Sequence, residues 1–277
     1  MKNFWIFSLS AAMVLTACSN ESEPSTVSPE PTKVTLTFSP YQMEVMARQT
    51  RSTVSIADVV THLDVWIYES GTECASVHQA SSDAGFGNVT VTLDKTKTYT
   101  LYAIGHRADG ASLTDGVISF TDDKVTHSMY YSTTFSPATT TNISAEMTRI
   151  VGQFRLEITD DISVDVAKMQ FTVTNVFDRW DVSTGGTHGI DRTSTIMYNG
   201  SSSIFNVYAI VTDTQTKHTV TVTALDADGQ ELQSRTFTDV TLCNGYRTTY
   251  RGTFFIDTPM TMTFTVGDWN EFDIVNF

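Results

Sequence analysis

The sequence predicts an all-β protein with two antiparallel β-sandwich domains in tandem. Apolar residues alternate with polar ones along many short runs rich in Val, Ile, Thr and aromatic side chains, as in half-buried strands. Turn signals containing Gly, Asn and Asp separate these runs at short spacing. Long helical periodicity is absent, and 277 residues suit two sandwiches of about a hundred residues or slightly more each.

The predicted strands fall into two series that divide near residue 148. The first series is 34–38, 63–68, 89–93, 99–104, 117–120, 128–132 and 141–147. The second series is 151–158, 168–175, 204–211, 218–224, 235–240, 250–255 and 260–266. We therefore expect an N-terminal sandwich over 33–147 and a C-terminal sandwich over 148–277. Two single helical turns are predicted, 56–60 behind Ser55 and 164–167 behind Ser163, because serine can cap a helix.

Residues 1–17 have the layout of a secretory signal peptide. Lys2 precedes a short apolar stretch over residues 4–14, which is too short to remain as a membrane-spanning helix. The run Leu15-Thr16-Ala17-Cys18 resembles the bacterial lipobox, which implies cleavage between Ala17 and Cys18 and acylation of Cys18. Several acyl chains hold a protein at a membrane far better than one chain does. The alternative is a plain signal peptide in which Cys18 is incidental.

The composition of residues 18–32 predicts a disordered, acidic tether, because Ser, Glu and Pro dominate and almost no side chain there could be buried in a core. Removal of residues 1–17 takes away one Lys and no acidic residue, so the formal net charge moves from -14 to -15. An acidic chain without a basic cluster cannot neutralise phosphates, and we expect no nucleic-acid partner. For the same reason, attachment to a membrane would depend on the lipid alone.

Catalytic, metal and cofactor sites find no support in the sequence. The six histidines are dispersed and lack the short spacing of a zinc site: His62, His78, His106, His127, His188 and His218. The run Asp226-Ala227-Asp228-Gly229 lacks a third calcium ligand and predicts a hairpin turn. No nucleophile elbow, P-loop or dinucleotide fingerprint is present. We expect no enzymatic activity, no metal and no cofactor.

Cys74 and Cys243 remain once Cys18 is set aside. An exported location permits a disulfide, but the two cysteines lie far apart in sequence and in different predicted domains. A disulfide and two free thiols both stay open, and free thiols are the expectation.

Two features are candidates for contact with a ligand or partner. The aromatic residues could form a sugar-binding platform, although packing in the sandwiches is the more ordinary role for them. They are Trp66, Tyr68, Tyr130, Tyr131, Trp180, Tyr198, Tyr208, Trp269 and Phe272. Residues 177–203 are the least strand-like segment, and we expect a long loop there that faces a partner.

The order of these motifs resembles the fimbrillin superfamily of Bacteroidetes, in particular its lipid-anchored fimbrial anchor and accessory subunits. The resemblance rests on the lipobox and tether, the strand at 34–38, and the runs DVVTHLDVWIY at 58–68 and MTRIVGQFRLEITD at 147–160. It extends through VAKM at 166–169 and VTVTALD at 220–226, and so covers essentially the whole mature chain. The acidic residues after Cys18 loosely match the surface-export signal of lipoproteins from this group, and a plain spacer is equally expected.

This resemblance implies two transthyretin-like β-sandwiches and no catalytic centre. It implies that Val34, Leu36 and Phe38 form the inward face of a first strand, which stalk subunits lose when a protease cuts after an arginine. Arg48 and Arg51 lie where that processing arginine would be, and ordinary solvated link residues are the alternative for both. A lost first strand leaves a groove that a strand from the next subunit fills.

The resemblance therefore implies a surface-exposed outer-membrane lipoprotein that attaches or assembles fimbriae by strand complementation. Its partners would be other fimbrial subunits and the outer membrane, and a host or glycan ligand stays open. The alternatives are a surface glycan-binding lipoprotein and a cleaved, polymerising stalk subunit.

Overall fold

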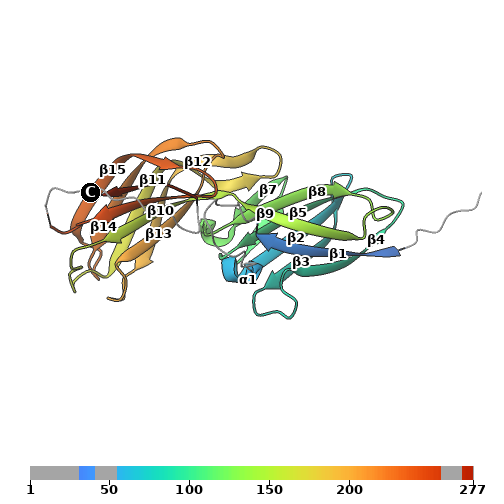
Figure 1. Cartoon of the computed structure of the whole chain (residues 1–277), viewed down its shortest axis with the longest axis horizontal. Helices are drawn as coiled ribbons and strands as arrows, with labels where there is room; N and C mark the ends of the chain where they lie inside the picture. Colours follow the sequence, from blue (N-terminus) through green and yellow to red (C-terminus); the bar gives the residue numbers. More distant parts are fainter. Residues whose placement is uncertain (1–30, 41–54, 257–269, 277) are drawn as a thin grey trace, which may run out of the picture.

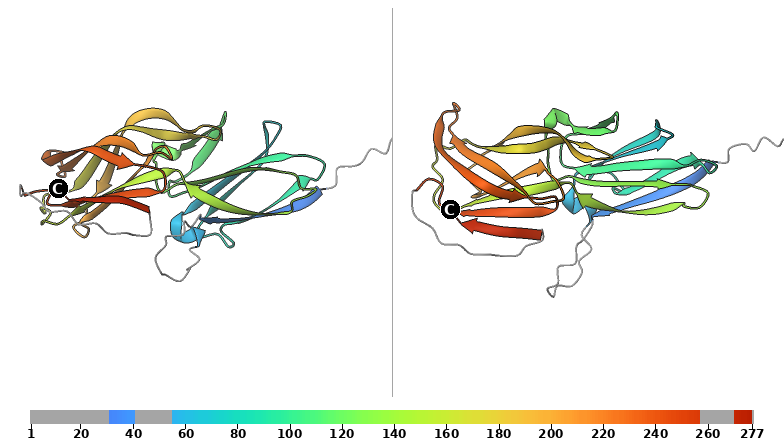
Figure 2. Two further views of the ribbon diagram at one scale, coloured as in Figure 1. Left: turned by 45° about the horizontal axis from the view of Figure 1, so that its top comes forward. Right: turned by 90° about the horizontal axis from the view of Figure 1, so that it is seen from above.

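The computed structural model describes residues 31–40, 55–256 and 270–276, and these are mostly β-strand. The strands form two sandwiches that lie end to end along the long axis of the molecule (Figures 1 and 2). The predicted all-β fold with tandem sandwiches is therefore confirmed. The predicted strand at 260–266 lies outside the described residues.

The N-terminal sandwich has two sheets joined at one corner. Its main elements are β1 (Pro31–Pro40), β2 (His62–Glu69), β3 (Thr72–Ala80), β4 (Asn88–Asp94), β5 (Tyr99–His106), β8 (Met129–Phe135) and β9 (Asn142–Arg149). The strand order is β3-β2-β5-β8-β9-β1-β4, and β8 and β9 pair only through Met129 with Arg149 and Tyr130 with Thr148. Strand β3 was not predicted from the sequence, because its side chains are mostly exposed and show no buried face.

Three short elements complete this half of the chain. They are α1 (Ile56–Val59), the hairpin of β6 (Ala111–Thr114) and β7 (Val117–Phe120), and a 3-10 turn over Thr121–Asp123. Ser55 caps α1 through a capping box with Asp58, which confirms the predicted helical turn. At 164–167 the chain turns, with the N–H of Val166 donating to the carbonyl of Ser163 at 3.1 Å and Ser163 Oγ accepting from the N–H of Asp165 at 3.2 Å, but the predicted helical character is wrong.

The C-terminal sandwich begins directly after Ile150. Its elements are β10 (Val151–Ile158), β11 (Lys168–Asp181), β12 (Gly185–Met197), β13 (Ile204–Ile210), β14 (Thr216–Leu225), β15 (Glu231–Leu242), β16 (Tyr246–Gly252) and β17 (Asn270–Asn276). The strand order is β15-β14-β11-β13-β10-β16-β17, and β12 pairs with β11. Strand β16 begins four residues before the predicted 250–255, and β17 was not predicted.

Both sandwiches share one topology. In each, the first strand lies between an antiparallel and a parallel neighbour: β1 between β4 and β9, and β10 between β13 and β16. The second strand of each pairs with the third and fifth strands, β2 with β3 and β5, and β11 with β12 and β14. The chain therefore contains a structural repeat, and β17 is an addition to the second copy that pairs in parallel with β16.

Each sandwich encloses its own apolar core. The first core includes the inward faces of β1, β2, β4, β5 and β9. The second is built around aromatic contacts of Phe154, whose ring centroid lies 6.3 Å from that of Phe171, 5.9 Å from that of Phe237 and 5.4 Å from that of Tyr250. Such cores supply most of the stabilising burial in a sandwich.

The predicted loop at 177–203 is wrong, because most of it forms the end of β11 and the whole of β12. A register shift between Val173 and Val176, with Asn175 at φ 55°, bends β11 away from β14. Gly186 lies in β12, and glycine is required there because a Cβ would collide with the ring of Phe177. Gly185 and Gly186, which look like loop residues in the sequence, are thus strand residues that lie against the rings of Trp180 and Phe177.

The bent end of β11 joins the two sandwiches. There Trp180 pairs with Ile118 of β7, so a strand contributed by the N-terminal half extends the C-terminal sheet. A third apolar cluster fills this junction and contains Trp66, Ile104, Ala108, Ile118, Phe120, Val125, Tyr130, Ile150, Val151 and Ile210. Tyr130 packs its ring 5.5 Å from that of Trp180, and its hydroxyl donates to the carbonyl of Val182 at 3.3 Å.

A buried histidine also lies at the junction. The ring of His127 stacks on that of Tyr208 in β13 at 5.8 Å, and its Nε2 accepts from Arg149 Nε at 2.8 Å. Burial, and then the positive charges of Arg149 and Arg107, lower the pKa of His127 to about 3. His127 therefore stays neutral in the folded protein at pH values where an unfolded chain binds a proton.

We predict that this histidine makes the fold less stable in acid. The folded pKa of about 3 lies below the ordinary value of 6.5, so the unfolded state takes up a proton first as the pH falls through 6.5. Each pH unit between 6.5 and 3 then costs about 1.4 kcal/mol of unfolding free energy.

Urea unfolding at pH 7 and pH 5 measures this effect. The loss expected from His127 is about 2 kcal/mol, and it disappears in His127→Gln, whose amide oxygen can accept from Arg149 without titrating. The control is His188→Asn, which removes a histidine whose side chain is 54% exposed. An equal pH dependence in wild type and His127→Gln would contradict the prediction.

Candidate functional site

The first strand, β1, is the structural feature on which the sequence-predicted site depends. It pairs antiparallel with β4 over Pro31–Thr37 and in parallel with β9 over Thr35–Pro40. Val34, Leu36 and Phe38 point into the core and are 0, 0 and 4% exposed. Thr37, which alternates with them, is exposed. The two-residue alternation of this segment therefore corresponds to one buried and one outward face.

Backbone hydrogen bonds hold β1 beyond its regular ladders. The N–H of Thr35 donates to the carbonyl of Thr141 at 2.8 Å, and the N–H of Phe38 donates to the carbonyl of Gly87 at 2.8 Å. Burial of Val34, Leu36 and Phe38 contributes roughly 1.5–3 kcal/mol each. Among the described strands, β4 pairs with β1 alone, so loss of β1 would detach β4 from its sheet.

Other predicted site residues lie outside the described part of the chain. These are Ala17 and Cys18 of the lipobox, residues 18–30 of the predicted tether, and Arg48 and Arg51. The last two residues of the predicted tether, Pro31 and Thr32, are instead the start of β1 and pair with β4. The sequence places both arginines between Pro40, the last residue of β1, and Ser55, the cap of α1. Any cut at either position would therefore separate β1 from the rest of the chain covalently.

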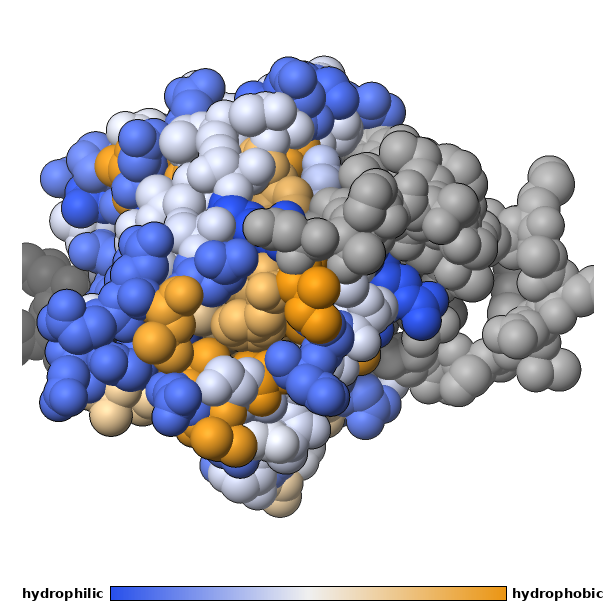
Figure 3. Space-filling model, turned by 90° about the vertical axis from the view of Figure 1, so that its left-hand side faces the viewer, coloured by the Kyte–Doolittle hydropathy of each residue, from blue (hydrophilic) through white to orange (hydrophobic). Residues whose placement is uncertain are grey.

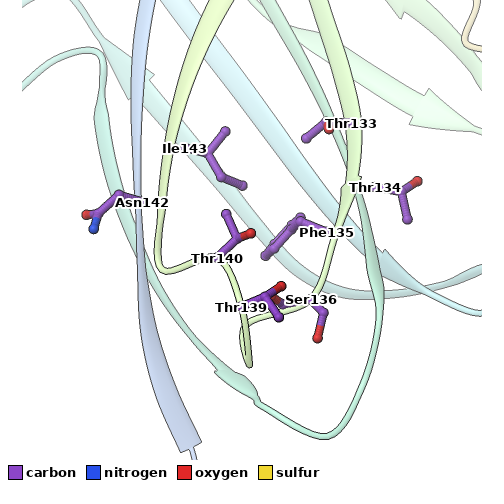
Figure 4. Close-up of a pocket in the computed structure, with 8 residues that line it drawn as sticks. All are labelled: Thr133, Thr134, Phe135, Ser136, Thr139, Thr140, Asn142 and Ile143. Carbon is purple, nitrogen blue, oxygen red and sulfur yellow. The ribbon is translucent and has the colours of Figure 1, made fainter.

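A pocket of about 380 Å³ opens beside β1, where β8 and β9 diverge after their short pairing (Figure 4). Its lining is dominated by hydroxyl and amide groups and consists of Thr133, Thr134, Phe135, Ser136, Thr139, Thr140, Asn142 and Ile143. Its lining contains hydroxyl groups but no His, Asp, Glu, Lys or Cys that could activate one of them, so it offers hydrogen bonds rather than an arrangement for catalysis.

Three of the histidines converge on one carboxylate, a cluster that the sequence analysis missed. Asp64 is 6% exposed. Its Oδ2 is hydrogen-bonded to His106 Nε2 at 2.6 Å, and its Oδ1 is hydrogen-bonded to His78 Nδ1 at 2.7 Å. His62 stacks on both imidazoles, with ring centroids 5.5 and 5.6 Å away. Burial, His106 and His78 lower the pKa of His62.

The cluster forms because strand register brings distant residues together. His62 faces His106 across β2 and β5, and Asp64 faces His78 across β2 and β3. The spacing of these residues in the sequence does not indicate a cluster, because the pairing of β2 with β3 and β5 has to be known first. The hydrogen bonds of His106 and His78 satisfy the buried carboxylate of Asp64. Among the described residues no group of His, Cys, Asp and Glu has the arrangement of a metal site.

The aromatic residues do not form an open platform on the described surface. Trp66 is 7% and Tyr130 9% exposed within the junction cluster, and Trp180 packs against them. Tyr68, Tyr102 and Tyr208 line the same cluster. Trp269 lies outside the described residues, as does the side chain of Phe272.

Cys74 and Cys243 are free thiols, exposed and buried respectively. Burial raises the pKa of both thiols, so neither is an activated nucleophile.

The run Asp226–Gly229 forms the turn between β14 and β15, in which Asp226 Oδ1 accepts from the N–H of Gln230 at 2.7 Å. Within the described ranges no helix is long and apolar enough to cross a membrane.

Several solved structures resemble this fold at low sequence identity. A candidate adhesin from Bacteroides ovatus is 15% identical with a TM-score of 0.49, and the match covers 74% of this chain and 77% of that chain. The fimbrial anchor protein Mfa2 from Porphyromonas gingivalis is 11% identical with a TM-score of 0.43, covering 74% and 82%. A candidate cell adhesion protein from Bacteroides uniformis is 13% identical with a TM-score of 0.44, covering 78% and 89%.

Comparison with curated proteins gives no match. A protein-family model gives a match over nearly the whole chain, from residue 24 to residue 274. That range includes β1, both sandwiches and the junction between them. Because the matching model is that of the fimbrillin-A associated anchor proteins Mfa1 and Mfa2, the chain belongs to this family of fimbrial anchor proteins.

Proposed function

We propose that this protein is an anchor or accessory subunit that attaches surface fimbriae to the outer membrane through a lipid on Cys18. The lipobox supports the anchor, and residues 18–30 form a short tether that leads from Cys18 to β1. The chain enters the N-terminal sandwich at the end that points away from the C-terminal sandwich (Figure 1). A membrane attached there would leave the C-terminal sandwich facing outward.

The observation that carries this proposal is the complete integration of β1 into its own sandwich. Two ladders and three buried side chains hold β1, and β1 is the segment that links the tether to the folded protein. An anchor needs this link because it transmits any pull on the fibre to the lipid. In this proposal the groove between β4 and β9 is filled by the protein's own strand, and strand complementation occurs elsewhere in the fibre.

The competing function is that of a polymerising stalk subunit processed after Arg48 or Arg51. A cut there would break the covalent connection between the lipid and the sandwich, and the product would begin at Gln49 or Ser52. Departure of β1 would then open a groove lined by the partners of Val34, Leu36 and Phe38. The two functions therefore differ in one observable, the N-terminus of the native surface protein.

We predict that Cys18→Ala loses fatty-acid label and leaves the membrane fraction. The reason is that the lipid supplies the hydrophobic attachment and no polybasic segment adds to it. Metabolic labelling and membrane fractionation measure both outcomes. Retention of the variant in outer membranes washed at high salt would contradict lipid anchoring.

A second prediction concerns processing. Mass spectrometry of the native surface protein, from cells with and without trypsin-like protease activity, should find the N-terminus at a lipidated Cys18 in both cases. A mature chain that begins at Gln49 or Ser52 only when the protease is active would establish the stalk function instead.

A third prediction tests the contribution of β1 to folding. Leu36→Ala should lower the unfolding free energy by about 2–5 kcal/mol, since Leu36 is fully buried and the truncation leaves a cavity. Its matched control is Thr37→Ala on the exposed face of the same strand, which should change stability by about 0.5 kcal/mol or less. Equal effects of the two substitutions in urea unfolding would show that β1 does not stabilise the sandwich.

A further inference from the structure

Five large apolar side chains are exposed among the described residues, and all five lie in the C-terminal sandwich. They are Val164 (98% exposed), Met197 (68%), Ile256 (56%), Leu232 (42%) and Ile204 (40%). Single exposed apolar residues are ordinary on a protein surface, but a cluster of them indicates a contact surface. Their spatial arrangement is therefore informative.

Strand pairing and loop contacts bring these residues to one end of the sandwich, which we name the distal pole. Met197 pairs with Lys168 and Leu225 pairs with Glu231, next to Leu232. The N–H of Tyr198 donates to the carbonyl of Ala167, and the N–H of Ile158 donates to that of Ser203, next to Ile204. Figure 3 views this end of the molecule and shows apolar side chains gathered between polar ones.

Hydrogen bonds hold residues 254–256, which form one side of the distal pole. The two carboxylate oxygens of Asp160 accept from the N–H groups of Phe254, Phe255 and Ile256 at 2.7–2.9 Å. Arg235 donates to the carbonyls of Phe254 and Ile256 at 2.8 and 3.2 Å. The backbone that carries Ile256 therefore loses little conformational entropy on binding, which favours affinity.

The loops around this apolar surface are acidic. The segments 159–167, 198–203, 226–230 and 253–256 contain five aspartates and neither Lys nor Arg, while Lys168 and Arg235 lie on the adjoining strands β11 and β15. The aspartates are Asp160, Asp161, Asp165, Asp226 and Asp228. Charge complementarity therefore favours a partner whose contact surface is apolar at its centre and carries Lys or Arg at its rim.

The distal pole is the end of the molecule opposite the start of β1 (Figure 1). We propose that it is the docking surface for the adjoining fimbrial subunit, which presents an apolar patch rimmed by basic residues. This inference rests on the proposed anchor function, because only attachment at the N-terminal end directs the pole outward. A second copy of this chain is disfavoured as the occupant, since symmetric contact would bring two acidic rims together in a protein of net charge -14.

Site-specific photo-crosslinking in cells that make fimbriae tests the proposal directly. A photoreactive amino acid at Val164 or Leu232 should crosslink to a fimbrial subunit identified by mass spectrometry, while the same amino acid at the exposed Glu146 of β9 should not. Crosslinks confined to residues 257–269 of the same chain, to a second copy, or to lipid would overturn the proposal.

Paired substitutions then separate the two physical contributions. Val164→Ser with Met197→Ser should reduce the fimbriae retained by cells by roughly tenfold, the effect of losing about 1.4 kcal/mol of contact. Asp161→Asn with Asp228→Asn should weaken retention mainly at low salt, and Asp109→Asn with Glu146→Gln is the charge-matched control.

Thermal unfolding of each variant shows whether its fold is intact. Unchanged retention in folded apolar and charge variants would overturn docking at the distal pole and leave the anchor function standing. Wild-type protein that never co-fractionates with fimbriae would refute the anchor function itself.

Discussion

The structure depends above all on the two-sided pairing of β1. Strand β4 reaches the rest of its sheet through β1, and the parallel ladder to β9 closes the sandwich on the other side. The same strand is the covalent route from the tether to the folded protein. In the proposed anchor, the stability of the N-terminal sandwich and the attachment of the whole protein both depend on this segment, and a load on the protein would act on a strand that is hydrogen-bonded along both edges.

The junction carries such a load from one sandwich to the other. A linker of one residue, Ile150, would by itself leave the domains free to bend. The pairing of β7 with the end of β11 and the burial of Trp66 and Tyr130 replace that freedom with a shared sheet and a shared apolar cluster. Extensive apolar contact between domains favours one relative orientation. Two sandwiches joined in this way form a stiff element, which suits the base of a fibre.

The features that the sequence could predict are those that a single strand displays by itself. The alternation at 34–38, 89–93 and 151–158 needs no partner to be read, and β1, β4 and β10 lie there. Features that depend on register were missed. The grouping of His62, His78 and His106 around Asp64 requires the pairing of three strands, and β12 was obscured by glycines that fit under the rings of Phe177 and Trp180.

The two sandwiches differ at the edges of their corresponding strands β9 and β16. In the C-terminal sandwich β17 covers the edge of β16. In the N-terminal sandwich β9 diverges from β8, and its edge is guarded by polar outward residues such as Ser144 and Glu146. Polar and charged residues on an edge discourage unwanted strand addition.

The distal pole differs from these edges, because its apolar side chains are exposed. Solubility selects against exposed apolar clusters, so one that persists in an otherwise acidic, threonine-rich surface is best explained by a partner that covers it.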